Sequence, residues 1–100
     1  LPAELLLHFG LQSLYFVLSF APPKTTVTII TEWENPYDFW NRQLAYVILP
    51  GGECLNELLL INGFAKVTDK YFCSKLADYQ LLNRQAQLNE LGIYSQVKRF

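Results

Sequence analysis

The chain has 100 residues, of which 51% are hydrophobic and 15% aromatic, with five glycines and five prolines. This length and composition suit one small globular domain and exclude a disordered or fibrous chain. Eight Lys and Arg residues against nine Asp and Glu residues give a formal net charge of −1, which argues against tight, non-specific binding of nucleic acid through charge alone.

An apolar segment at residues 3–21 is the first predicted element. Pro2 and Glu4 suit the first turn of a helix, and Pro22 ends it. Apolar side chains surround most of this helix, so we predict that the rest of the domain largely covers it. Polar residues such as Gln12 interrupt the run, and a membrane-associated segment or a signal remnant are the alternative interpretations.

Two or three strands and two more helices follow. β-branched and apolar runs predict the strands, and Gly63 and Gly92 suit the ends of the two helices. The predicted bounds are 24–31 and 44–49 for two strands, 55–62 for a short helix, 64–67 for a brief third strand and 75–91 for the last helix. This order predicts an α+β fold.

The chain has two cysteines, Cys54 and Cys73. Two thiols do not make a disulfide framework, and no Cys/His spacing indicates zinc. We expect small buried side chains, with a single bridge between them as the alternative, in a cytoplasmic rather than a secreted protein. The chain begins with Leu1 and not with Met, which indicates a processed product or a fragment.

Five segments carry a family pattern in the right order: 38–46 (DFWNRQLAY), 55–57 (LNE), 63–67 (GFAKV), 85–87 (QAQ) and 91–95 (LGIYS). They resemble the D-x-[aromatic]-G-R-x-L-A-Y, V-N-E and G-[apolar]-A-x-V motifs, and then the terminal helix and its G-[apolar]-W stop, of staphylococcal-nuclease-like (thermonuclease) domains. The resemblance is strong over residues 38–95 and weak over 3–37, so residues 1–100 are interpreted as one nuclease-like domain fragment.

The resemblance implies an OB-fold-type β-barrel with three helices, here partial because the family's first three strands have no counterpart. It also implies hydrolysis of phosphodiester bonds in DNA or RNA, usually with calcium in the complete domain. The calcium carboxylates, the general base and a second arginine belong to those missing strands, and nothing in residues 1–37 replaces them. We therefore expect no metal or cofactor site in this chain and no cleavage by the chain alone.

The resemblance assigns three site residues. Arg42 matches an arginine that contacts the phosphate, and its planar fork suits two phosphate oxygens; the alternative is an arginine that caps a loop or pairs with Asp38. Trp40 and Tyr71 match aromatic residues beside the nucleotide, where they would stack on bases; the alternative is partly buried packing. Asn56 and its neighbour Glu57 match residues that fix the start of a helix.

The chain departs from the family pattern at three positions near these residues. Asn41 replaces a glycine, which suits a left-handed backbone conformation, Phe39 replaces a basic residue, and Asp69 replaces an aromatic one. We therefore expect weak binding of DNA or RNA. The alternatives are a non-catalytic module that binds RNA, single-stranded DNA or protein, as in Tudor-containing relatives, and a membrane-tethered fragment anchored by residues 3–21. A membrane is the less favoured partner. Open strand edges predict self-association or a partner segment that completes the barrel.

Overall fold

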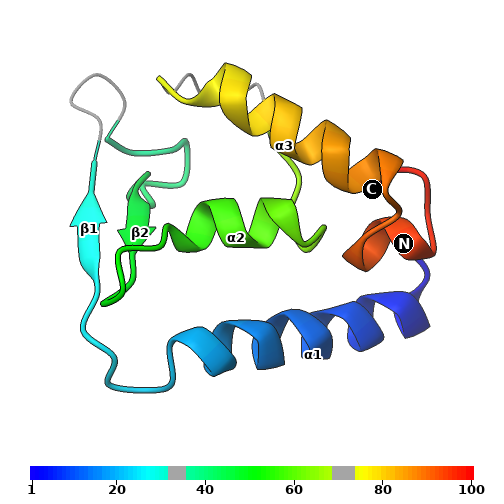
Figure 1. Cartoon of the computed structure of the whole chain (residues 1–100), viewed down its shortest axis with the longest axis horizontal. Coiled ribbons are helices and arrows are strands. Elements are labelled where there is room, and N and C mark those ends of the chain that lie inside the picture. The colour runs from blue at the N-terminus through cyan, green and yellow to red at the C-terminus, as the bar shows by residue number, and fades with distance from the viewer. Residues whose placement is uncertain (32–35, 69–73) are drawn as a thin grey trace.

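The structure is a computed structural model that describes residues 1–31, 36–68 and 74–100. The elements in chain order are α1 (Ala3–Phe20), β1 (Thr28–Ile30), β2 (Tyr46–Ile48), α2 (Leu55–Ile61), α3 (Leu76–Leu88) and the 3₁₀ helix η1 (Gly92–Ser95) (Figure 1). The predicted α+β order with three helices is confirmed. The sheet of the described residues has two strands, so the barrel stays a prediction.

Helix α1 lies along one edge of the molecule, beside α2 (Figure 1). Phe9 is its buried residue, and the Phe16 ring contacts the Phe64 ring with centroids 5.3 Å apart. Most of its other large apolar side chains are exposed, so the prediction of a largely covered helix is wrong. By length and composition alone, α1 is the one helix among the described residues that could cross a membrane, a test that core helices and signal sequences also pass.

Strands β1 and β2 pair antiparallel, with Ile29 opposite Val47 at the centre. Both strands are shorter than predicted, and all three residues of β1 are exposed. Among the described residues, β1 has β2 as its one strand neighbour, so its other edge is open. An open edge of this kind can accept another strand.

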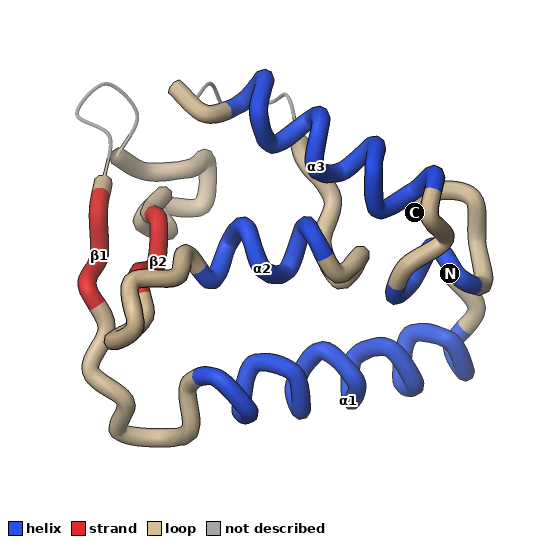
Figure 2. Tube along the Cα trace, viewed as in Figure 1, coloured by secondary structure: helices blue, strands red, loops and turns tan. Residues whose placement is uncertain are grey.

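The core lies where α2, α3 and η1 meet (Figure 2). Leu60 of α2, Ala86 of α3, and Ile93 and Tyr94 of η1 are buried there. Tyr79, nearer the start of α3, is buried against the start of α2 and β2. The face of α3 that carries Leu81 and Leu88 is exposed. Helix α3 ends at Leu88, three residues before the predicted end, because Asn89 caps it and Glu90 takes a left-handed conformation with φ 53°.

Two glycines allow the turn after α2 to touch the segment before η1. Gly63 and Gly92 have φ values of 75° and 55°, and the Ile93 amide donates to the Gly63 carbonyl at 3.0 Å. A Cβ atom on Gly63 would collide with the Leu91 carbonyl oxygen, and one on Gly92 would collide with the Asn62 carbonyl oxygen. Both positions therefore favour glycine, since the left-handed backbone disfavours other residues and the adjacent carbonyl groups leave no space for a side chain.

The brief strand predicted at residues 64–67 does not form. The Phe64 amide instead donates to the Leu59 carbonyl at 2.9 Å and closes the end of α2. A strand requires a pairing neighbour, and the sheet of the described residues offers none at this position. Cys54 is a half-buried free thiol. Cys73 lies outside the described residues.

Candidate functional site

The loop between the two strands contains the predicted phosphate residue. Its hairpin, residues 37–43, is closed by a bridge between Tyr37 and Gln43. The Asp38 amide donates to the Arg42 carbonyl at 2.9 Å, and the Asn41 amide donates to the Asp38 carbonyl at 3.0 Å. Asn41 has φ 62°, the left-handed backbone conformation that Asn suits at the place of the family's glycine.

The Asp38 carboxylate holds this hairpin together from inside. One oxygen, Oδ1, accepts the amides of Trp40 at 2.9 Å and Arg42 at 2.8 Å, and Oδ2 accepts Arg42 Nε at 2.6 Å. Burial by itself raises the pKa of Asp38, but the Arg42 hydrogen bonds and charge, together with the Trp40 amide, lower the pKa below its ordinary value of 3.8. The carboxylate is therefore ionised at neutral pH and fixes the Arg42 side chain at its Nε.

Arg42 and Trp40 lie side by side on the surface. The Arg42 guanidinium carbon is 5.4 Å from the Trp40 ring centroid, and the Trp40 and Phe39 rings make an edge contact at 5.7 Å. The Arg42 side chain is 73% exposed despite its bond to Asp38, and Trp40 is 67% exposed. Arg42 thus pairs with Asp38, as one interpretation predicted, and still presents its cation to solvent beside an aromatic face.

Tyr71, the second predicted stacking residue, lies outside the described residues, as does Asp69.

Asn56 anchors the strand that follows the hairpin to the start of α2. Its Oδ1 accepts the Val47 amide at 2.9 Å, and its Nδ2 donates to the Ala45 carbonyl at 3.0 Å. One amide side chain thus satisfies a donor and an acceptor of the chain at β2. Asn56 has the structural role that the sequence predicted for it.

Tyr79 connects α3 to the start of α2. Its hydroxyl donates to Glu57 Oε2 at 3.1 Å and lies 3.6 Å from Cys54 Sγ, and Lys75 Nζ lies 3.6 Å from the same Glu57 oxygen. Burial raises the pKa of Tyr79, and the Cys54 and Glu57 side chains raise it further, so the hydroxyl stays a donor. Sequence reasoning missed Tyr79 because its partners lie 22 and 25 residues earlier.

The carboxylates near Arg42 do not fit a calcium ion. Calcium takes six to eight oxygen ligands, whereas both oxygens of Asp38 already accept hydrogen bonds within the hairpin. Across residues 1–31, 36–68 and 74–100, no three His, Cys, Asp or Glu side chains form a group that could hold a metal. The calcium site that the resemblance implies for a complete domain therefore finds no ligand set in the part of the chain that the structure describes.

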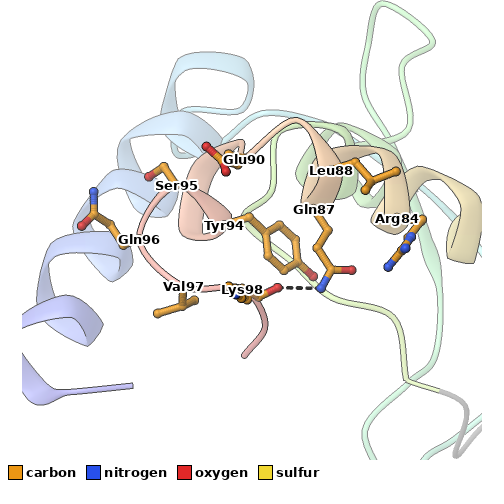
Figure 3. A pocket seen from close by; sticks show the side chains of 9 residues that line it. All are labelled: Arg84, Gln87, Leu88, Glu90, Tyr94, Ser95, Gln96, Val97 and Lys98. Atoms are coloured by element: carbon orange, nitrogen blue, oxygen red, sulfur yellow. Dashed lines mark hydrogen bonds between the residues drawn. The ribbon is translucent and has the colours of Figure 1, made fainter.

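A shallow hollow lies at the other end of the molecule, between the end of α3 and the C-terminal segment (Figure 3). Arg84, Lys98 and Glu90 are its charged lining residues, and Gln87 Nε2 donates to the Lys98 carbonyl at 2.6 Å. Arg42 and Trp40 do not line it. Its charges are mixed, so the hollow lacks the electrostatic character of a phosphate site.

Comparison with known proteins identifies the family. No curated protein matches the chain. The family model described as "Staphylococcal nuclease homologue" matches residues 4–96, which include both the motif-rich region and the segment of α1 and β1 where the sequence resemblance is weak. The chain belongs to the staphylococcal nuclease homologue family and is a nuclease-like domain.

Proposed function

We propose that the hairpin at residues 37–43 binds DNA or RNA weakly, with Arg42 on a backbone phosphate and Trp40 stacked against a base. The observation that carries this proposal is the exposed guanidinium 5.4 Å from an exposed indole. A phosphate and its attached base are neighbours in a nucleic acid strand, so a cation beside an aromatic face suits one nucleotide. Membership of a nuclease-like family supports the same choice of ligand.

Asp38 has a positioning role in this proposal. It binds Arg42 through Nε, while the Arg42 side chain stays 73% exposed, so a phosphate in solution can reach the guanidinium. A preformed cation loses less conformational freedom on binding than a free arginine side chain would. The carboxylate also weakens the local positive field, which agrees with weak rather than tight binding.

Hydrolysis of phosphodiester bonds is the activity that we propose for a complete domain of this type. The general base and metal ligands would then come from residues other than those described, and no catalytic step is assigned to this chain. The absence of a ligand set among the described residues and the loss of the basic residue at Phe39 favour the interpretation as a binding module. The membrane-tethered alternative depends on α1 alone.

Binding can be measured by fluorescence anisotropy with labelled single-stranded DNA and RNA of one length. We expect Arg42→Ala to weaken binding and to reduce the slope of log K against log salt by about 0.7, the value for one phosphate contact on a single strand. Arg42→Lys should retain the slope, because the charge remains, but lose affinity as the planar fork is lost. Trp40→Ala should weaken binding by about 5-fold or more with the slope unchanged.

The matched control is Arg84→Ala, which removes an exposed arginine from α3, far from the hairpin in sequence. It should change neither affinity nor slope by a comparable amount. Equal losses in the Arg42 and Arg84 variants would show that overall charge and not the hairpin governs binding, and would refute the proposed site.

Cleavage is tested separately with the same nucleic acids and added calcium. We expect none from the isolated chain. Cleavage that Arg42→Ala abolishes would contradict the binding-module interpretation and assign the chain to an active nuclease.

A further inference from the structure

Helix α1 has two opposite apolar faces, and its own domain covers one of them. Phe9 is buried and Leu5, Ser13 and Phe16 are half-buried. At about 100° per residue these positions share one side of the helix. They face α2 and the turn that follows it, as the contact between Phe16 and Phe64 shows.

The opposite side carries a row of four exposed leucines: Leu7 at 66%, Leu11 at 42%, Leu14 at 50% and Leu18 at 36% exposure. Their spacing is four, three and four residues, which confines them to an arc of about 60°, roughly opposite to the covered face. This is the spacing with which one helix packs knobs into the holes of another. In the described part of the chain, no element lies on the outer side of α1 (Figure 1).

We propose that the row Leu7, Leu11, Leu14 and Leu18 is a self-association surface, on which α1 pairs with α1 of a second copy of this chain. The proposal goes beyond nucleic-acid binding and does not depend on it. The spacing of four, three and four residues is the spacing of the contact positions in helix–helix packing, which suits a helix as the occupant.

Charge favours a second copy. Glu4 is the one acidic residue of α1, and the helix has no Lys or Arg. Two copies can therefore pack along the leucine row without placing like charges opposite each other at its centre, and an antiparallel pair also opposes the two helix dipoles. Helices that bind membrane surfaces usually carry Lys and Arg on their polar face, which α1 lacks.

The size of the surface predicts a weak dimer. A helix of 18 residues is about 27 Å long, and one pair of such helices buries less than the roughly 800 Å² per partner of a standard stable interface. We therefore expect half-dimerisation at roughly 0.1 mM, with monomer at low micromolar concentration.

Sedimentation velocity over a concentration series tests the proposal on the whole chain. The double variant Leu11→Gln/Leu14→Gln should raise the dissociation constant at least 10-fold. The matched control Leu81→Gln/Leu88→Gln makes the same two changes at exposed leucines of α3 and should dimerise like the original chain. Circular dichroism on both variants checks that the fold is kept.

A second measurement does not depend on a loss of function. In a Cys54→Ser/Cys73→Ser background, Leu14→Cys should be joined into a covalent dimer by a short bismaleimide at 0.1 mM protein, and Leu81→Cys should not. The proposal is overturned if the chain stays monomeric up to about 1 mM, or if both cysteine variants cross-link equally. It is also overturned if the original chain floats with phosphatidylcholine vesicles and Leu11→Gln/Leu14→Gln abolishes that flotation.

Discussion

The clamp that Asn56 forms between α2 and β2 makes a stability prediction for Asn56→Ala. The substitution removes the acceptor of the Val47 amide and the donor to the Ala45 carbonyl. Both backbone groups are partly buried, and no other part of an alanine side chain can pair with them. Ala45 and Val47 follow the hairpin that contains Arg42, so the clamp also fixes where that hairpin ends.

The magnitude follows from the two bonds. A buried polar group that loses its partner costs about 1–3 kcal/mol, and water reaches these partly buried groups, so we take about 1 kcal/mol for each. Ala has a greater helix propensity than Asn, which offsets roughly 0.5 kcal/mol of this loss of stability. We expect Asn56→Ala to lower the free energy of unfolding by about 1.5 kcal/mol, a decrease in melting temperature of roughly 6–12 °C for a domain of this size.

Urea denaturation followed by circular dichroism at neutral pH measures the change. The control is Asn62→Ala at the other end of the same helix, where the side chain donates to the Leu58 carbonyl of that helix at 2.8 Å. It should cost less than about 1 kcal/mol. If Asn56→Ala costs no more than Asn62→Ala, the amide does not clamp the strand to the helix and the reasoning fails.

Three further predictions concern single positions. Because the pKa of Asp38 is lowered in the fold, its ionisation stabilises the protein above pH 3.8, and this stabilisation is lost as the pH falls through the pKa of the folded state. Asp38→Asn should therefore be less stable at pH 7, and its urea midpoint should fall less steeply below pH 4 than that of the original chain. Asn41→Gly should leave the melting temperature nearly unchanged, whereas Asn41→Val should cost about 1–2 kcal/mol at φ 62°; equal effects would contradict the left-handed requirement. Gly63→Ala should cost more than the roughly 1 kcal/mol of its backbone angle, because the new methyl meets the Leu91 carbonyl, and a melting temperature equal to that of the original chain would refute the close crossing.

Local signals in the sequence predicted most elements of the fold, and the family motif predicted two features near the site. Helices α1 and α2 begin and end within one residue of their predicted bounds, because Pro2, Pro22 and Gly63 restrict or release the adjacent backbone and so mark helix ends. The left-handed conformation of Asn41 was expected from the family motif, in which Asn41 takes the place of a glycine. The structural role of Asn56 came from the family motif rather than from its neighbours.

Features that depend on distant partners were not predictable. Apolar periodicity identified the covered side of α1 as apolar but could not tell that a second apolar side, with Leu11 and Leu14, would be left exposed. The expected strand at 64–67 was wrong because pairing is decided by another segment. Tyr79 escaped notice because Glu57 and Cys54 meet it only after α2 and α3 pack together.

The contact between Gly63 and Gly92 also has a consequence for the order of folding. It joins the end of α2 to the start of η1 across 28 intervening residues, and closing a loop of that length costs chain entropy before the contact forms. We therefore expect α2 and α3 to form first. The contact between Gly63 and Gly92 should form late, as the step that completes the packing of the C-terminal half of the chain. The amide of Ile93, which donates to Gly63, is the natural hydrogen-exchange probe of that step. The Ile93 amide should exchange only when the whole domain unfolds. The amides of α1, which is attached by few contacts, should exchange through local opening.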